Sequence, residues 1–498
     1  MIDFTLHLRA ALARRGRVPL RRALAGAMRQ ALADATLAAG APLPASRVLA
    51  CELGIGRNSV LQVYEQLGAE GWLVADRQGT HVAHVGSAAR VAPVPASALP
   101  ALAARAATWG DAIDDDEAPR PFLPGMPALD EFPLQAWQRR VAQAWRAMPA
   151  SALADREVGG EPVLRAAIAA HLRAARGVRC APDQVVVTSG TQESLALCAQ
   201  LLADPGDRAW IENPGYIGAS TVLSSAGLRL VPMPIDAQGM APPAAAWRHP
   251  PRLVYTTPSH QFPLGVRLSL ARRLELLERA TATGAWILED DYDSEFCRGE
   301  PLAAMHGLQP DAPVVYLGTF SKTLYPALRL GYLVLPASAF ARVRPALARR
   351  LPPGRSAEQE ALAGLLNDGD FARHLRRMRR LYAQRHDALR TALEHAWPLP
   401  LQLSPGEGGM HLAMALPAHV RDREVVALAR ERGLAPRALS SHHLGDGPAL
   451  NGLVLGYANV AAEDAPRHVR SLAAMVCQVA GHEYIPPSPD RGIGAVAR

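Results

Sequence analysis

Residues 121–485 alternate between segments with helical spacing of apolar residues and short runs of consecutive apolar residues. The runs are QVVVTSG, AWIEN, RLVYTT, AWILEDD, VVYLGT and LGYLVL. Short apolar runs bounded by turn residues are typical of strands buried on both faces of a sheet. Strands that alternate with helices along a chain pair in parallel, so the pattern predicts an α/β domain with a mostly parallel sheet.

Length and local composition divide the rest of the chain. A chain of 498 residues is expected to contain two or three domains, because a domain usually has about 100–200 residues. Residues 1–85 are predicted to form one small unit. Residues 86–120 are rich in Ala and Pro and then acidic, which predicts a linker. Residues 486–498 are predicted to be a flexible tail.

The composition favours a cytoplasmic protein. The sequence has no run of about 18 apolar residues, so no membrane-spanning helix is expected. Its N-terminus lacks the apolar core of a secretory signal. The five cysteines are scattered without a Cys-x-x-Cys pair, which favours reduced thiols over disulfides or a zinc site. We therefore predict no metal site.

The small unit has the pattern of a helix-turn-helix followed by a hairpin. Helical spacing of apolar residues extends from 19 to about 39, a short helix covers 46–53, and a further helix covers about 58–69. The last two are joined by a tight glycine-containing turn, which is typical of a helix-turn-helix. The segments WLV and HVAHV, separated by a turn at 76–80, predict a two-stranded wing.

Basic charge is concentrated in this unit. Residues 1–90 contain eleven Arg and six acidic residues, a net of +5, whereas the whole chain carries +7. Arg57, Asn58 and Ser59 lie at the start of the second helix, where a recognition helix contacts base edges and phosphates, and Arg47 lies on the preceding helix. This pattern predicts DNA binding; the alternative is a small helical packing module with solvated charges.

The stretch PLPASRVLACELGIGRNSVLQVYEQLGAEGWL resembles the winged helix-turn-helix of the GntR superfamily of bacterial regulators. The resemblance covers nearly all of the helix-turn-helix. It implies that Arg47, Arg57, Asn58 and Ser59 contact operator DNA, and that Gly79 and Thr80 lie at the tip of the wing.

The chain contains a single lysine, Lys322, beside 52 arginines. An amine can deprotonate and attack a carbonyl, whereas arginine stays protonated, so this lysine points to chemistry that arginine cannot perform. The alternative is the chance survival of a surface lysine. Thr319 and Ser321 precede Lys322, and Arg329 follows it. Hydroxyls and a guanidinium suit a phosphate and the amine suits a Schiff base, which predicts pyridoxal 5′-phosphate (PLP).

Upstream segments contain further candidates for holding this cofactor. Asp290 and Tyr292 end an apolar strand and point to one face if the extended geometry continues, so they can pair with a ring nitrogen and a ring hydroxyl. The Gly-Thr-Gln turn at 190–192 precedes a helix, where backbone amides bind phosphate. Tyr216 can stack on a flat ring. The plainer alternatives are a helix cap or metal-binding acid cluster, an ordinary strand–helix turn, and an ordinary loop aromatic.

The motifs TSGTQ, NPGY, TPSHQFPLG, EDDYDSEF and SKTLYPALRLGY, in this order, resemble fold-type I PLP enzymes of the aminotransferase family. A winged helix-turn-helix linked to such a domain resembles the MocR subfamily of GntR regulators. The resemblance implies a homodimer and a smaller C-terminal α/β subdomain. It implies that Lys322 forms the Schiff base, Asp290 meets the ring nitrogen and Tyr292 meets the phenolate oxygen. The residues that it places at the cofactor are Gly190, Thr191, Gln192, Tyr216, His260, Asp290, Tyr292, Thr319, Ser321, Lys322 and Arg329.

Three positions depart from an active aminotransferase. Asp155 stands where a Tyr usually reaches the phosphate of the partner subunit. Asn451-Gly452 occupies the region that carries the Arg for the substrate carboxylate, and Arg437 is a candidate replacement. Without a bidentate carboxylate clamp, turnover of ordinary amino acids is expected to be slow.

Three functions remain open at this point. The first is a transcription regulator that binds operator DNA and senses PLP, or a PLP–amine adduct, through Lys322, with vitamin B6 metabolism as a candidate target. The second is an active PLP-dependent aminotransferase with an accessory DNA-binding module. The third is a degenerate large domain that serves only for dimerisation. The basic helix-turn-helix, the PLP motifs and the missing carboxylate Arg favour the first.

Overall fold

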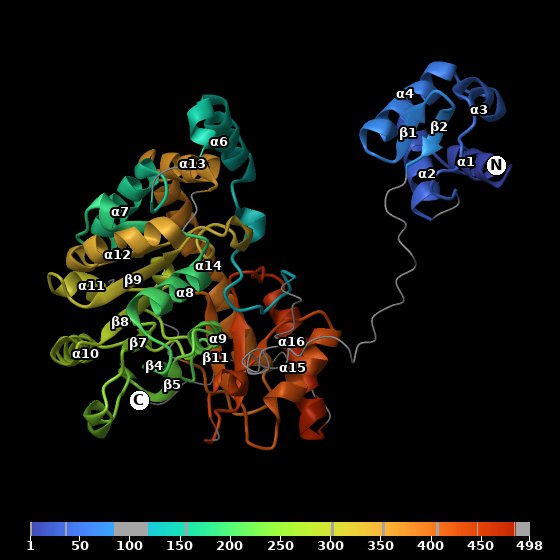
Figure 1. The fold of residues 1–498 in the computed structure, drawn as a ribbon. Helices are drawn as coiled ribbons and strands as arrows, with labels where there is room; N and C mark the ends of the chain where they lie inside the picture. The colour runs from blue at the N-terminus through green and yellow to red at the C-terminus, as the bar shows by residue number, and fades with distance from the viewer. Residues whose placement is uncertain are drawn as a thin grey trace. The chain divides into compact units, whose positions relative to one another are not determined.

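The computed structural model describes residues 2–34, 37–83, 118–154, 158–299, 303–350, 354–404, 408–445, 447–482 and 484. The chain divides into two compact units, Met1–Leu102 and Ala103–Arg498 (Figure 1). All of the predicted linker except its last three residues lies outside the described residues, and so does the predicted tail.

The described part of the small unit contains four helices and a hairpin, coloured blue in Figure 1. The predicted helix-turn-helix is present, and its first helix ends at Gly54, whose φ of +65° is the left-handed conformation that glycine adopts readily. The elements are α1 (Ile2–Ala13), α2 (Leu20–Ala33), α3 (Ser46–Leu53), α4 (Arg57–Ala69), β1 (Leu73–Asp76) and β2 (Gly79–Val82).

Two helices of this unit differ from the sequence analysis. Helix α2 ends at Ala33 rather than near residue 39, because the backbone that follows pairs with the wing. The amide of Gly40 donates to the carbonyl of Val82 at 2.9 Å, and that of Leu43 donates to Thr80 at 2.8 Å. Helix α1 is an addition to the prediction, and it closes the core of the unit. The buried side chains of this core include Phe4, Leu8, Leu24, Met28, Leu49, Val63 and Leu67.

An eight-stranded sheet forms the centre of the large unit (Figure 1). Its strands from β9 to β5 are parallel, which confirms the predicted sheet type. Strand β10 is antiparallel to both neighbours, because the chain returns from β9 through a loop without a crossover helix. The order across the sheet is β3 (Val185–Thr188), β10 (Gly331–Val334), β9 (Val314–Thr319), β8 (Trp286–Asp291), β7 (Leu253–Thr256), β4 (Arg208–Asn213), β5 (Arg229–Asp236) and β6 (Gly239–Met240).

Helices cover both faces of this sheet. Successive side chains of β3 enter different cores: Val186 packs in one cluster, and Val185 and Val187 pack in another. This two-sided burial explains why the strands are continuous apolar runs in the sequence. The helices described in this part of the chain, up to residue 367, are α6 (Leu134–Ala147), α7 (Pro162–Arg176), α8 (Thr191–Leu202), α9 (Ile217–Ser225), α10 (Leu270–Thr283), α11 (Met305–Leu308), α12 (Ala337–Arg350) and α13 (Ser356–Asn367).

The predicted C-terminal subdomain follows the long helix α14 (Asp370–Ala396) and is coloured orange to red in Figure 1. Its antiparallel sheet has the order β11, β13, β12. Helices α15 and α16 belong to the same part of the chain. Their bounds are β11 (His411–Ala415), α15 (Asp422–Glu431), β12 (Arg437–Ala438), β13 (Gly452–Gly456) and α16 (Ala465–Ala480).

Two further features concern membranes and thiols. Within the described residues, every helix is too short or too polar to cross a bilayer. All five cysteines lie in the described part of the chain and none forms a disulfide.

Candidate functional site

Close backbone packing brings several candidate residues to one edge of the large sheet. Gly331 in β10 pairs with Thr188 at the end of β3 and with Thr319 at the end of β9. A Cβ at Gly331 would lie 2.8 Å from the Cα of Gly190. The turn before α8 and the loop after β9 therefore meet, and that loop contains Lys322.

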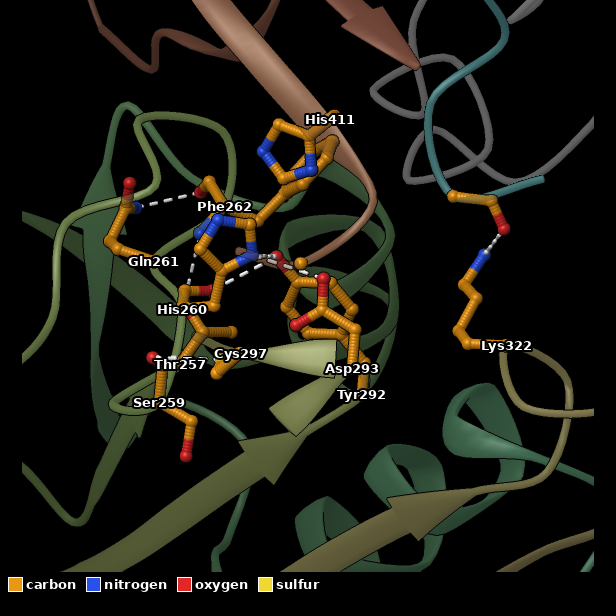
Figure 2. A network of polar contacts seen from close by, with 12 residues as sticks. Thr257, Ser259, His260, Gln261, Phe262, Tyr292, Asp293, Cys297, Lys322 and His411 are labelled. Atoms are coloured by element: carbon orange, nitrogen blue, oxygen red, sulfur yellow. Dashed lines mark hydrogen bonds and ion pairs between the residues drawn. The ribbon is translucent and has the colours of Figure 1, made fainter. Parts of the chain in front are cut away.

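Lys322 is half-buried in the loop after β9. Its Nζ donates a hydrogen bond to the carbonyl oxygen of Gly125 at 2.9 Å, which is the dashed line beside Lys322 in Figure 2. The hydroxyl of Thr319 accepts a hydrogen bond from the amide of Ser321 at 3.1 Å and so shapes the start of the loop. Lys322 is thus held by its surroundings and is not a free surface residue.

Asp290 lies at the end of β8 and is 3% exposed. Its Oδ2 accepts a hydrogen bond from the hydroxyl of Tyr255 at 2.7 Å, whereas Oδ1 has no partner among the described residues. Burial raises the pKa of Asp290 to about 7, and the charge of Lys322 acts in the opposite direction. A buried carboxyl with one orphaned oxygen fits a cationic ring N–H, as the pyridinium of PLP offers.

The neighbouring Asp291 points to the other face of β8 and has a different role. Its Oδ2 accepts hydrogen bonds from Arg176 at 2.7 Å and from the hydroxyl of Tyr316 at 2.6 Å. Arg176 also donates to the hydroxyl of Ser259 at 2.6 Å. Asp291 is therefore held by a buried ion pair with Arg176, although its Oδ1, like that of Asp290, lacks a partner among the described residues. The ion pair makes Asp290 the better candidate of the two for a ligand.

Tyr292 contacts His260, as Figure 2 shows. Its hydroxyl donates to the backbone carbonyl of His260 at 2.9 Å and lies 3.2 Å from Nδ1 of that ring. The same Nδ1 lies 3.0 Å from Oδ2 of Asp293. Burial and the charge of Asp293 raise the pKa of Tyr292 well above its usual value. The phenol therefore stays protonated and remains a hydrogen-bond donor.

His411 completes a buried group with His260 and Asp293. One potential metal-ligand atom from each of the three lies within 4.8 Å of the others, a grouping that the sequence analysis did not predict. Burial and the nearby His260 lower the pKa of His411 well below its usual value, so its ring is neutral. His260 and Asp293 are already hydrogen-bonded to each other, and we interpret them as a histidine–carboxylate pair.

The start of α8 faces open space. Gly190 is the N-cap residue with φ of +100°, and an added Cβ there would meet no atom within 4 Å. Thr191 and Gln192 form the first turn, whose backbone amides are available to an anion. Nε2 of Gln192 donates to the hydroxyl of Tyr216 at 2.8 Å, so the predicted stacking residue adjoins the predicted phosphate turn. Arg329 is exposed and has a left-handed φ of +49°.

The region predicted to lack a carboxylate-binding Arg has a structural role. The side-chain amide of Asn451 donates to the carbonyls of Pro417 and Val420, both at 2.9 Å. A Cβ at Gly452 would lie 2.1 Å from the carbonyl oxygen of Met414, so no larger residue fits there. Asp155 lies outside the described residues. Arg437 starts β12, and its charge helps burial to lower the pKa of His442 to about 4.

The residues predicted to contact DNA lie on α3, α4 and the wing. Arg47, Arg57 and Asn58 are exposed, whereas Ser59 is half-buried and its amide donates to the carbonyl of Gly56 at 3.0 Å. A basic, exposed helix start has the chemistry that phosphates and base edges require.

The wing corrects one prediction. Its two-residue tip is Arg77-Gln78, whereas Gly79 and Thr80 belong to strand β2. The reason is the side chain of Asp76, whose Oδ1 accepts from the amides of Gln78 at 2.7 Å and Gly79 at 3.1 Å and closes the turn early.

Sequence reasoning missed several residues of these sites. Gly125 contributes only a carbonyl, which no residue type indicates. Tyr255 lies in an apolar strand, and only its hydroxyl could have indicated a polar contact. The pairing of Asp293 with His260 could have been suspected, because a further carboxylate follows Tyr292 in EDDYDSEF. Arg77 is a basic residue within the predicted wing turn.

Comparisons with known proteins agree with this division of the chain. Residues 132–450 match the family model "Aminotransferase class I and II", and residues 16–82 match "Bacterial regulatory proteins, gntR family". The chain is 37% identical to the probable rhizopine catabolism regulatory protein MocR of Rhizobium meliloti, over 91% of this chain and 93% of the relative. It is 35% identical to the pyridoxine biosynthesis transcriptional regulator PdxR of Corynebacterium glutamicum, over 86% and 90%.

A solved structure is also similar. The α-aminoadipate aminotransferase LysN of Thermus thermophilus, in complex with N-(5′-phosphopyridoxyl)-L-leucine, has a TM-score of 0.65 and 29% identity. The similarity covers 72% of this chain and 92% of that structure. The large unit therefore has the fold of a PLP-binding family.

A GntR-type helix-turn-helix joined to an aminotransferase-type domain defines a class of DNA-binding transcription regulators. Within that class, the chain belongs to the MocR-type regulators of the GntR family.

Proposed function

We propose that this regulator takes up PLP in its large unit through a Schiff base with Lys322, and that PLP or a PLP–amine adduct changes its affinity for operator DNA. The observation that carries the proposal is a buried carboxyl, Asp290, that has one orphaned oxygen and lies near enough to Lys322 for the charge of the lysine to lower its pKa. When bound, PLP supplies the aldehyde that an amine can attack.

The residues of this chain have separate tasks in the proposed site. Asp290 holds a proton on the ring nitrogen. Tyr292 is kept protonated, and its hydroxyl would turn from the carbonyl of His260 to donate to the ring oxygen. Tyr216 stacks on the ring. Backbone amides at the start of α8 hold the phosphate, together with Thr319, Ser321 and Arg329. His260 orients Tyr292 through the two contacts described above.

Binding of DNA and of the effector are linked in this proposal. If PLP changes operator affinity, operator DNA changes PLP affinity by the same factor. We propose a homodimer, so that two helix-turn-helix units meet two half-sites, and action in the cytoplasm, where operator DNA is found. The relative named as a pyridoxine biosynthesis regulator supports vitamin B6 metabolism as the controlled process.

Borohydride reduction tests the proposal directly. The purified protein with PLP should show a visible absorption band, and reduction should fix the label on Lys322. The chain has no other lysine side chain, so the N-terminal amine is the one competing site. Lys322→Ala should lose the band and the label. A protein that stays colourless with added PLP would support a large unit used only for dimerisation.

A titration of the chain's own upstream DNA with and without PLP separates the two remaining functions. A regulator should show an operator affinity that depends on PLP in the wild type and not in Lys322→Ala. Steady turnover of amino and keto acids with no effect of PLP on DNA binding would instead favour an active aminotransferase with an accessory module.

A further inference from the structure

One segment of the large unit, residues 121–128, contacts Lys322 through its Gly125. We call it the covering segment. It follows directly on the stretch that the sequence predicts as the linker from the DNA-binding unit. The carbonyl of its Gly125 accepts the hydrogen bond from Nζ of Lys322 at 2.9 Å. A Cβ at Gly125 would lie only 2.6 Å from that Nζ, so the backbone approaches the amine as closely as glycine allows.

The covering segment is otherwise held by the C-terminal subdomain and α14. The amide of Ala435 donates to the carbonyl of Pro121 at 2.8 Å, and that of Gly456 donates to Phe122 at 2.9 Å. Beyond Gly125, the amide of Ala128 donates to the hydroxyl of Tyr382 at 3.1 Å. The Lys322 contact therefore lies between hydrogen bonds that hold the segment on either side.

The backbone of the segment is strained at Phe122, three residues before this contact. Phe122 is fully buried with φ of +71°, a conformation that a bulky residue rarely adopts, whereas Gly125 adopts its φ of +73° readily. A strained backbone persists only when its surroundings hold it. The segment should therefore shift when one of its holding contacts is removed.

Schiff base formation removes this contact. The neutral amine of Lys322 adds to the aldehyde carbon, the aldehyde oxygen leaves as water with the two amine hydrogens, and a C=N bond replaces C=O. The imine nitrogen would carry at most one hydrogen in place of the two or three of the free amine. Loss of this donor would leave the buried carbonyl of Gly125 without its hydrogen bond, which is unfavourable.

We propose that the carbonyl of Gly125 positions the free amine of Lys322, and that loss of this hydrogen bond on imine formation releases the covering segment and signals to the chain leading to the DNA-binding unit. This inference rests on the proposed function, because it needs the imine at Lys322. It adds the physical step by which cofactor binding at Lys322 affects residues outside the site. Gly125 acts through Lys322 and does not itself touch the reacting carbon.

Lys322→Met tests this step because it removes the donor and nearly preserves the length of the side chain. The readout is hydrogen exchange at the amides of Ala435 and Gly456, which donate to the covering segment. PLP should accelerate both by about tenfold or more in the wild type, the effect of losing a hydrogen bond from an amine. Lys322→Met without PLP should exchange as fast as the PLP-loaded wild type, and its operator affinity should shift in the same direction.

Lys322→Arg is the matched control, since it keeps a charged donor at this position and should exchange slowly. Gly125→Ala places a methyl group where Nζ lies and should give fast exchange with the lysine intact. Slow hydrogen exchange at Ala435 and Gly456 in Lys322→Met would overturn the inference. The inference would also fail if PLP left the exchange of the wild type unchanged while the absorption band showed that the imine had formed. Absence of the absorption band in the wild type would instead refute the proposed function, while Lys322→Met still tests the hydrogen bond itself.

Discussion

In the small unit, the residues proposed to contact DNA lie on the surface, and Arg47, Arg57 and Asn58 are exposed. In the large unit, the ionisable residues proposed to meet the PLP ring are withdrawn from solvent, and Asp290 and His260 are each 3% exposed, whereas Arg329, proposed for the phosphate, is exposed. Exposed charges stay solvated and cost the fold little. Burial raises the pKa of Asp290, and the charge of a buried group depends on every neighbour.

This difference has a consequence for mutations. A change at the DNA surface should alter one function and leave the rest of the molecule intact. A change at the buried site should alter ligand binding and stability together. Substitutions at four positions, two buried and two exposed, test this contrast.

Leu67→Ala should unfold the small unit and leave the large unit folded. Leu67 is fully buried in the separate core of the small unit, and such a truncation costs about 2–5 kcal/mol, a large share of the stability of a small domain. Calorimetry should show the loss of one transition, with operator binding abolished and PLP uptake retained. Leu6→Ala, at a 54% exposed position, is the control. Loss of PLP uptake would show that the units do not fold independently.

Asp290→Asn should weaken PLP binding about 10- to 100-fold, because the ring nitrogen loses its charged partner. In the cofactor-free protein it should stabilise the fold. The pKa of this carboxyl is about 7 in the folded state and near 4 when unfolded, so ionisation destabilises the fold increasingly from pH 4 to 7 and fully above pH 7.

The gain from Asp290→Asn should therefore be roughly 2–4 kcal/mol at pH 8 and smaller at pH 5. Thermal unfolding at the two pH values measures it. Asp183→Asn, at an exposed carboxyl, should change neither quantity. An equal gain at both pH values would contradict the buried, shifted carboxyl.

Arg57→Ala should weaken operator binding by about five- to a hundredfold, because one phosphate or base-edge contact contributes about 1–3 kcal/mol. PLP uptake and the stability of the large unit should not change. Arg349→Ala removes the same charge from an exposed position on the large unit and controls for the change in the net charge of the protein. Equal effects of the two variants would mean that Arg57 acts only through net charge.

Arg77→Ala should have the smallest effect, weakening operator binding by less than about tenfold and reducing its salt dependence by about one phosphate contact. Thr80→Ala should change the affinity less, since Thr80 lies in β2 and contributes its carbonyl to the amide of Leu43. A fluorescence titration at several salt concentrations distinguishes the two. The reverse order of effects would restore Gly79-Thr80 as the DNA-contacting tip.

The sequence predicted the sheet where burial on both faces produced continuous apolar runs, as in β3 and β8. Strand β5 escaped notice because it lies near the edge of the sheet, and its sequence RLVPMPID is partly exposed and contains two prolines. The strands of the C-terminal subdomain are short and separated by loops, so only the resemblance indicated them.

The candidate site, too, has residues that the sequence indicates and contacts that it does not. Lys322, Asp290 and Tyr292 could be proposed from the sequence because their chemistry depends on residue type and their spacing follows the strands, and their role at a cofactor stays a prediction. The contact of Lys322 with Gly125 joins positions 197 residues apart through a backbone carbonyl, which every residue has. The wing tip was misplaced by two residues because a side chain, Asp76, decided where the turn closes.

The separate core of the small unit has a practical meaning for protein engineering and for evolution. No side chain of that core is borrowed from the described part of the large unit. A different DNA-binding unit could therefore be joined upstream of residue 118, with the covering segment left in place, and the ligand site would not have to be rebuilt. Regulators built in this way can acquire new target genes while they keep the same chemical input.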